Sequence, residues 1–285
     1  MQLVEIRRYP VKSLLGEVVE AAEADSRGLA GDRLWAVRDA DGKFGSGKNT
    51  RRFRRMPGLF DLRAHTVPHA ASAALPLPDA VPPGSSLGVP AGSSLGVPAG
   101  NSLAVPAGSS LGVPAGSSLA VPLVELPDGR RFAADDPVGH QAISDHLGRP
   151  VTLAPEATVL HHDEGPVSLI TTAALRALTG LAGPESNGAP VDPLRFRANL
   201  LLDVPGVGFP EDDWTGRRLR IGPGVVLRVV RPLTRCAMID MAQEQAPERR
   251  DLLKALAEHN DMTFGVFATV EQPGHLTVGD TTAWI

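Results

Sequence analysis

Cysteine is nearly absent from this chain of 285 residues, which contains only Cys236. A single cysteine excludes an intrachain disulfide framework and any cysteine-rich zinc site. It also excludes an iron–sulfur cluster held by the chain's own thiolates, because such a cluster needs about four of them. The one remaining thiol is therefore the first residue to consider for chemistry.

Long apolar runs and a strong excess of either charge are also missing. No stretch approaches the ~20 apolar residues needed to span a bilayer. The chain enters a strand-like pattern directly at residues 1–6, without the basic and apolar regions of a signal peptide. The net charge of −4 gives no reason to expect nucleic acid as a partner. We therefore expect a cytoplasmic protein of one large or two modest domains, which binds neither membrane nor nucleic acid.

Cys236 follows a strand-like apolar run at residues 225–230. Pro232 lacks a backbone donor, which favours the end of a strand, so Cys236 is expected on the loop just beyond. Arg231 and Arg235 flank the cysteine, and positive charge favours the thiolate, which is a nucleophile and a soft metal ligand. The alternative is a small buried hydrophobic residue, since free cysteine is often fully buried.

Two N-terminal positions carry groups suited to an anion. A Tyr-Pro pair ends the first strand, so Lys12 and Ser13 are expected on a loop, where an ammonium and a hydroxyl group suit phosphate. Arg33 precedes a later strand and offers a bidentate guanidinium. The alternatives are a solvated turn at Lys12 and an ion pair of Arg33 with Asp32 or Asp39.

Two stretches in the second half are further candidates. Arg195, Arg197 and Asn199 are expected on one face of an extended chain that runs into the apolar strand at 200–203. Guanidinium and amide groups side by side suit phosphate, and the alternative is a salt-bridged strand rim. Thr171 and Thr172 begin a helix, whose N-terminus favours anions, although plain capping also explains the hydroxyls.

Three stretches are interpreted without a site. Residues 42–49 come close to a phosphate-binding P-loop, but Asn49 stands where Ser or Thr is needed and no amphipathic helix follows. His161 and His162 would point to opposite faces of a strand, so a polar loop is favoured over a metal site. The basic residues at 48–55 are interpreted as a solvated face, with phosphate contact or docking of an acidic electron-transfer protein as alternatives.

An eight-residue repeat, Gly-Ser-Ser-Leu-Gly-Val-Pro-Ala, begins at Gly84 and continues to residue 122. Each copy contains glycine and proline and only two sizeable apolar side chains. Burying these cannot offset the backbone entropy of ordering, roughly 1–2 kcal/mol per residue. We predict a mobile, polyproline-like insertion in a surface loop.

Four short motifs resemble the MOSC family, which includes molybdenum cofactor sulfurase and the mitochondrial amidoxime-reducing component. They are Tyr9-Pro10-Val11-Lys12-Ser13, Gly31-Asp32-Arg33-Leu34-Trp35, Arg195-Phe196-Arg197-Ala198-Asn199 and Arg235-Cys236. The first two resemble the MOSC N-terminal β-barrel domain. The resemblance implies a mainly β (α+β) fold, with a barrel-like domain at 1–156 that contains the disordered low-complexity insertion at 76–122. A MOSC β-barrel with a few peripheral helices follows at 157–285.

The resemblance also implies a molybdenum–molybdopterin cofactor, with Cys236 as metal ligand and catalytic residue. The residues implied to hold the pterin and its phosphate are Lys12, Ser13, Arg33, Thr171, Thr172, Arg195, Arg197, Asn199, Thr234 and Arg235. Thr234 stands where the amidoxime-reducing component has serine.

The activity implied by the resemblance is removal of oxygen from N-hydroxylated small molecules. The chain has no flavin or haem motif, so the electrons would come from a separate ferredoxin-like, flavoprotein or cytochrome b5-like donor. Two alternatives stay open: a carrier of cofactor or sulfur on Cys236 without turnover, and a binding domain in which Cys236 is structural. The sulfurase relatives that motivate the carrier use a pyridoxal phosphate desulfurase domain, which this chain lacks.

Overall fold

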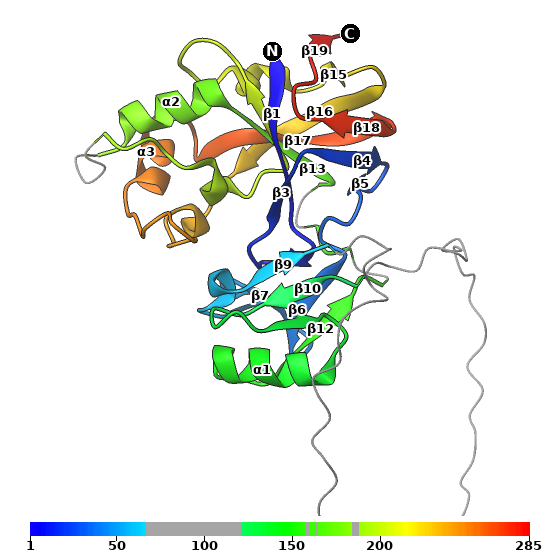
Figure 1. Ribbon diagram of the computed structural model, residues 1–285. Helices are drawn as coiled ribbons and strands as arrows, with labels where there is room; N and C mark the ends of the chain where they lie inside the picture. The colour runs from blue at the N-terminus through cyan, green and yellow to red at the C-terminus, as the bar shows by residue number, and fades with distance from the viewer. Residues whose placement is uncertain (67–120, 158–159, 163–164, 184–187) are drawn as a thin grey trace, which may run out of the picture. The chain divides into compact units, whose positions relative to one another are not determined.

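The computed structural model of the protein describes residues 1–66, 121–157, 160–162, 165–183 and 188–285 (Figure 1). The predicted insertion at 76–122 lies outside these residues, except for its last two positions. Strands dominate the described residues, accompanied by α1 (Pro137–Leu147), α2 (Thr172–Leu181) and α3 (Leu252–His259). The mainly β (α+β) fold class predicted from the sequence is confirmed. None of the helices in the described ranges has the length and apolar character required to cross a membrane.

The largest sheet has eight strands in the order β19-β15-β16-β17-β13-β14-β1-β3. Their bounds are β1 (Gln2–Arg8), β3 (Glu17–Val19), β13 (Val167–Thr171), β14 (Leu200–Asp203), β15 (Arg218–Ile221), β16 (Val225–Thr234), β17 (Thr263–Gln272) and β19 (Thr282–Trp284). A smaller sheet pairs β18 (Gly274–Thr277) with β4 (Ala21–Asp25), and β4 with β5 (Gly28–Leu29). Segments from both ends of the chain therefore share these two sheets.

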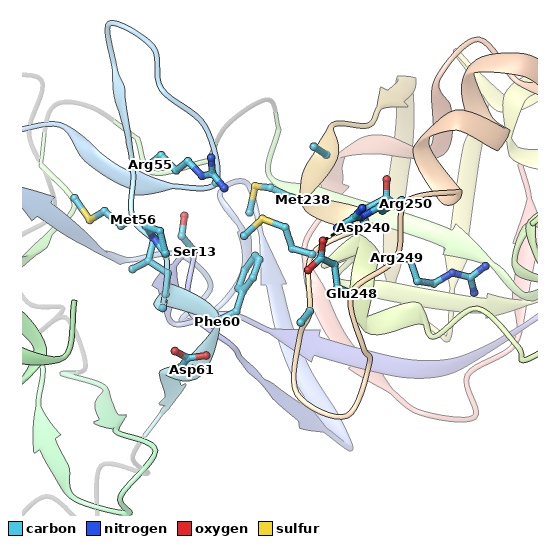
Figure 2. Close-up of a pocket in the computed structure, with 17 residues that line it drawn as sticks. Ser13, Arg55, Met56, Phe60, Asp61, Met238, Asp240, Glu248, Arg249 and Arg250 are labelled. Atoms are coloured by element: carbon cyan, nitrogen blue, oxygen red, sulfur yellow. Dashed lines mark ion pairs between the residues drawn. The ribbon is translucent and has the colours of Figure 1, made fainter. Parts of the chain in front are cut away.

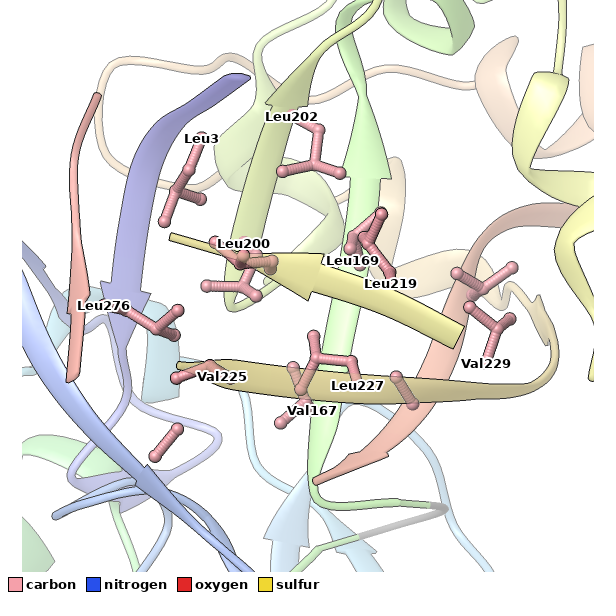
Figure 3. Packing of buried hydrophobic residues seen from close by; sticks show 14 of the residues in the cluster. Leu3, Val167, Leu169, Leu200, Leu202, Leu219, Val225, Leu227, Val229 and Leu276 are labelled. Atoms are coloured by element: carbon pink, nitrogen blue, oxygen red, sulfur yellow. The ribbon is translucent and has the colours of Figure 1, made fainter. Parts of the chain in front are cut away.

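The first strand joins the sheet of the C-terminal half. β1 pairs antiparallel with β14, and its register shifts between Leu3 and Glu5. A bulge of this kind inserts one residue and changes which side chains face the core, so Leu3 and Ile6 are both buried although they are three residues apart. They pack with Leu169, Leu200 and other side chains of the largest core (Figure 3). The predicted domain division at residue 156 stays a prediction.

A second core lies among residues 11–64 and 124–153. One sheet holds β12 (Val151–Pro155), β6 (Trp35–Asp39), β7 (Phe44–Ser46) and β8 (Phe53–Arg55), with β2 (Val11–Lys12) also pairing with β6; the other holds β11 (Arg131–Ala133), β10 (Leu123–Glu125) and β9 (Arg63–His65). β7 is followed by a loop and β8 rather than by a helix, which agrees with the rejection of a P-loop.

Helix α1 lies against β12 and has the ends that its sequence predicts (Figure 1). The Asp136 side chain accepts a hydrogen bond of 2.8 Å from the Val138 backbone N–H, and Pro137 occupies the first turn. Gly148 ends the helix in the left-handed conformation, with φ of 64°.

The predicted insertion connects β9 to β10, whose ends are paired directly: His65 lies opposite Leu123. For a mobile connection, each doubling of length costs about 0.6 kcal/mol of closure entropy. Replacing residues 68–120 with a short Asn-Gly turn should therefore raise the free energy of unfolding by about 2 kcal/mol. Urea unfolding measures this, and a variant with the same residues in shuffled order should match the wild type. A loss of stability on shortening would contradict a passive connection.

Helices α2 and α3 pack on each other through a third cluster, which includes Ile170, Leu178, Leu256 and Phe264. Helix α3 begins at Leu252 and ends at His259. Short 3-10 helices are η1 (Leu59–Asp61), η3 (Pro193–Phe196), η4 (Pro210–Trp214) and η5 (Ala237–Ile239). Two of them, η3 and η5, lie next to predicted site residues.

Candidate functional site

Cys236 lies directly after β16, as predicted. The strand ends at Thr234, the Arg235 N–H donates to the Met262 carbonyl at 2.8 Å, and η5 begins at Ala237. Cys236 is extended, with φ of −131°, and exposed. The interpretation of this residue as a small buried hydrophobic side chain is therefore wrong.

A cavity of about 190 Å³ lies beside Cys236. The predicted site residues that line it are Lys12, Ser13, Arg33, Arg195, Arg197, Thr234, Arg235 and Cys236. They come from four separate segments of the sequence, at residues 12–13, 33, 195–197 and 234–236. We call this space the Cys236 cavity.

The Cys236 cavity is strongly cationic. Its lining includes Lys12, Arg33, Lys48, Arg195, Arg197 and Arg235. Among the described residues that line it there is no aspartate or glutamate. Gathered cationic groups attract anions, and guanidinium groups suit phosphate in particular.

Backbone strain is concentrated at this cavity. Ser13, Arg33 and Arg197 adopt the left-handed conformation, with φ of 69°, 51° and 52°. Non-glycine residues rarely adopt it, and each costs roughly 1–3 kcal/mol. Three such residues at one cavity indicate that the fold holds these side chains in defined positions at the expense of stability.

Lys12 and Ser13 are held by the segments packed around them. The Lys12 ammonium donates to the His161 carbonyl at 2.8 Å and lies 5.4 Å from the centroid of the Phe53 ring. The Ser13 hydroxyl donates to the Gly45 carbonyl at 2.8 Å. Both side chains are buried, so the solvated-turn alternative is wrong at this position.

The Tyr9 ring contacts two arginines, Arg33 and Arg197, that belong to motifs far apart in the sequence. The ring lies 4.9 Å from the guanidinium carbon of Arg33 and 4.3 Å from that of Arg197. Burial raises the pKa of the Tyr9 hydroxyl, and the nearby Arg197 charge opposes the shift. A buried ring in contact with two guanidinium groups fixes the direction of both by cation–π attraction.

Asn199 holds Arg33, which lines the Cys236 cavity, in place from outside the cavity lining. Arg33 pairs with the buried Asp32, as the alternative interpretation had it, and also donates to the Arg197 carbonyl at 3.1 Å. The Asn199 amide oxygen accepts from Arg33 at 3.4 Å and from the Ser168 hydroxyl at 2.9 Å. Asn199 does not line the cavity, so its geometry suits positioning of Arg33 rather than direct contact with a ligand.

The predicted extended run from Arg195 to Asn199 is wrong. Residues 193–196 form η3, and Arg197 turns the chain in the left-handed region before β14 begins at Leu200. Arg195 is buried and donates to the carbonyls of Ile239 and Met241, at 3.2 and 3.4 Å. It therefore also fixes the loop that follows Cys236.

Thr171 and Thr172 do not line the Cys236 cavity, contrary to expectation. The Thr171 hydroxyl accepts from the Ala174 N–H and donates to the Glu211 carboxyl group at 2.8 Å; that of Thr172 donates to Asp203 at 2.7 Å. Burial raises the pKa of Glu211 to about 7. The hydroxyls at the start of α2 thus serve capping and packing, which was the alternative interpretation.

His161 and His162 are functional candidates that the sequence did not reveal. Both are buried, and among the described residues neither ring has a hydrogen-bond partner. Burial lowers the pKa of each to about 4, assisted by the charge of Arg38 at His161 and of Arg33 at His162. His162 lines the Cys236 cavity, whereas His161 packs edge-on against Phe44. Both residues lie in the loop between β12 and β13, as predicted, but their side chains are buried in it.

Because the pKa values of both histidines are lowered, we expect the free energy of unfolding to fall in acid. The unfolded chain binds protons near pH 6.5 and the folded chain only near pH 4, so stability falls as the pH decreases through this window. Between pH 7 and pH 5 each histidine should cost about 2 kcal/mol. Urea unfolding of His161→Phe should show about half of the loss, whereas the exposed control His275→Phe should keep all of it. An unchanged pH dependence in His161→Phe would overturn this account.

The sequence matches two family models. The MOSC N-terminal beta barrel domain matches residues 1–75, and the MOSC domain matches residues 156–283. The chain belongs to the MOSC family. The resemblance of its four motifs is thereby confirmed.

The solved structures that match this MOSC protein have low sequence identity to it and TM-scores below 0.5. The YuaD protein from Bacillus subtilis is 11% identical with a TM-score of 0.44, covering 99% of this chain and 93% of that chain. YiiM from Geobacillus stearothermophilus is 17% identical with a TM-score of 0.33, covering 55% and 67% of the two chains. YiiM from Escherichia coli is 19% identical with a TM-score of 0.31, covering 42% and 54%. No curated protein matches the sequence.

The MOSC family is associated with the molybdenum cofactor, and the residues present fit such a group. A phosphorylated pterin needs cationic groups, which the lining of the Cys236 cavity supplies. It also needs hydrogen-bonding groups, and the buried ring of His162, which has no hydrogen-bond partner among the described residues, can supply them. Molybdenum needs a soft ligand, and Cys236 is exposed at the cavity.

Proposed function

We propose that the protein binds a molybdenum–molybdopterin cofactor beside Cys236 and removes oxygen from N-hydroxylated small molecules with electrons from a separate donor. One observation carries the proposal: the only thiol of the chain lies at a cavity whose described lining has six cationic side chains and no carboxylate. The thiol suits a metal that prefers sulfur, and the cationic side chains suit the anionic organic scaffold that binds this metal.

When bound, the cofactor supplies two-electron chemistry at the metal. Breaking the N–O bond of a hydroxylamine-type group takes two electrons and two protons, and yields an N–H bond and one water. Cys236 would hold the metal, while Lys12, Arg33 and Arg197 would bind and orient the phosphorylated pterin. The rigid attachment of Arg33 to Asp32 and Asn199 limits reorganisation of this charge during the reaction.

His162 would act as a neutral hydrogen-bonding group rather than as a proton donor. With a pKa of about 4, its ring is almost entirely unprotonated at neutral pH. A neutral imidazole has one N–H donor and one acceptor nitrogen, so it can bind either a pterin edge or an N-hydroxyl group.

An acidic protein suits the role of electron donor. Lys48, Arg51, Arg52 and Arg55 are exposed on the β7–β8 segment, and Lys48 also lines the Cys236 cavity. Complementary charge raises association rates and orients the partners. A ferredoxin-like, flavin-containing or cytochrome b5-like protein with an acidic docking face would therefore reach the cavity entrance.

Metal and pterin analysis of the purified protein tests the proposal. Protein expressed with molybdate should contain molybdenum and release a fluorescent pterin, and it should reduce benzamidoxime with an artificial reductant. Absence of both metal and pterin would reject the proposal.

A carrier of cofactor or sulfur is the second candidate, because exposure of Cys236 leaves the sulfur accessible for transfer to another protein. Bound molybdenum without any reductase activity would favour the carrier. The same preparation thus separates the two functions.

A further inference from the structure

A second, larger cavity adjoins the Cys236 cavity. Its volume is about 530 Å³, and the two cavities share Ser13 and Met238. One wall comes from residues 55–61 and the other from the loop after Cys236, residues 237–250, as Figure 2 shows. A volume of this size lies in the range of small-molecule sites. We call it the methionine cavity.

Three thioether side chains line this cavity: Met56, Met238 and Met241. They account for three of the five methionines in the chain. Leu59 and Phe60 complete the apolar surface, and Figure 2 shows Met238 and Phe60 between the two walls. Methionine is flexible and polarisable and makes favourable contacts with aromatic rings. Such a surface suits flat apolar groups of varied shape.

The wall that carries Met238 and Met241 is held in place. Buried Arg195 donates to the carbonyls of Ile239 and Met241, and buried Gln243 donates to the Met238 carbonyl at 3.1 Å. Three carbonyls of this loop, those of Met238, Ile239 and Met241, are thus hydrogen-bonded to buried side chains. The cavity is therefore a formed site rather than a gap beside a loose loop.

Gly47 provides room for the two methionines. A Cβ atom at this position would lie 2.7 Å from Met238 Cγ and 3.2 Å from Met241 Sδ. Any side chain at residue 47 would push both thioethers into the cavity. Substitution of Gly47 therefore perturbs the methionine cavity through both thioethers, of which Met241 lines this cavity only and Met238 also lines the Cys236 cavity.

The charges at the rim balance. Arg55 and Arg250 are positively charged, and Asp61 and Glu248 are negatively charged. The Arg250 guanidinium lies 3.6 Å from the Glu248 carboxylate. An apolar interior with a balanced rim favours an uncharged ligand, since a charged one would lose hydration without a net opposite charge.

We propose that the methionine cavity binds the flat apolar body, aromatic in the best case, of an uncharged N-hydroxylated substrate, whose N–OH group then points toward Cys236. This inference rests on the proposed function for the identity of the reacting group. The two cavities adjoin at Ser13 and Met238, and Met238 lies two residues after the thiol, so a ligand body held in the methionine cavity lies beside the Cys236 cavity.

Calorimetric titration of the oxidised protein with benzamidoxime, without reductant, tests the inference. Met241→Gln and Gly47→Ala should each weaken binding about tenfold or more, since a lost apolar contact is worth 10–200-fold. Met238→Leu, which keeps an apolar side chain, should retain most of the affinity. The control Met262→Gln, whose side chain lies outside both cavities, should bind as the wild type does. Melting temperatures establish that each variant is folded.

The titration and the kinetics separate the two proposals. Because binding is measured without electrons, it reports on the cavity even if no turnover occurs. Hydroxylamine has no apolar body, so Met241→Gln should lower kcat/KM for benzamidoxime and leave that for hydroxylamine unchanged. Binding that is absent in the wild type, or unaffected in folded Met241→Gln and Gly47→Ala, would overturn the inference. Reduction of hydroxylamine alone would then leave the proposed function standing.

Discussion

Replacing Cys236 with serine should abolish reductase activity and leave the fold intact. The hydroxyl of serine is a far poorer ligand for a soft metal than a thiolate, so the proposed metal site would lose its one protein sulfur. Cys236 is exposed, and an exposed substitution usually changes the free energy of unfolding by less than about 0.5 kcal/mol. We therefore expect at least a hundredfold fall in benzamidoxime reduction with an unchanged melting temperature.

The pterin and the metal should respond differently in this variant. The cationic lining of the Cys236 cavity is unaltered, so pterin bound through its phosphate should be partly retained, while absorption from the sulfur–metal bond should disappear. Metal analysis, pterin fluorescence and visible absorption measure the three quantities. Val230→Ser, an exposed change on β16 away from the cavity, is the matched control. Equal activity and absorption in Cys236→Ser would refute the assignment of Cys236 as ligand.

Local sequence signals predicted the regular elements well. Asp136, Pro137 and Gly148 mark the ends of α1 because capping and left-handed φ depend on residues within one or two turns. These features need no information from distant parts of the chain. Cys236 does lie just beyond a strand, but Pro232 does not end it: β16 continues to Thr234, and its register shifts on both sides of Pro232.

Features that depend on distant partners could not be predicted. His161 and His162 are polar residues, yet both are buried. His161 contacts Lys12, which is 149 residues earlier in the chain, and Phe44 of β7, which is 117 residues earlier. Thr171 is engaged by Glu211, 40 residues later in the chain. Arg197 is left-handed without the glycine that normally signals such a turn.

The site could be predicted only in part, because sequence motifs identify residues but do not show which of their side chains face the cavity. Lys12, Arg33 and Cys236 line one cavity, as the family resemblance implies. Asn199 comes from the same motif as Arg197 but does not line the cavity. Its side chain is hydrogen-bonded to Ser168 and Arg33. The roles of these residues in binding stay predictions until a ligand is measured.

Substitution of Asp32 should have the largest effect on stability. Its carboxylate is fully buried, accepts the Tyr9 backbone N–H at 2.8 Å and pairs with Arg33. Asp32→Ala would leave the Tyr9 N–H without this acceptor and Arg33 without its buried counter-charge. Removing one partner of a buried ion pair costs about 3–5 kcal/mol. Urea unfolding of the purified variant measures the loss.

Two further variants identify the cause of that loss. Asp32→Asn keeps an oxygen acceptor for the Tyr9 N–H and removes only the charge, so it should be more stable than Asp32→Ala. Asp128→Ala removes an exposed ion pair with Arg130 and should cost less than about 1 kcal/mol. If Asp32→Ala were as mild as Asp128→Ala, Arg33 would be held by its other contacts, which include Tyr9, Arg197 and Asn199. The buried pair would then serve to set the direction of Arg33 toward the cavity, and pterin retention in Asp32→Asn would measure that contribution.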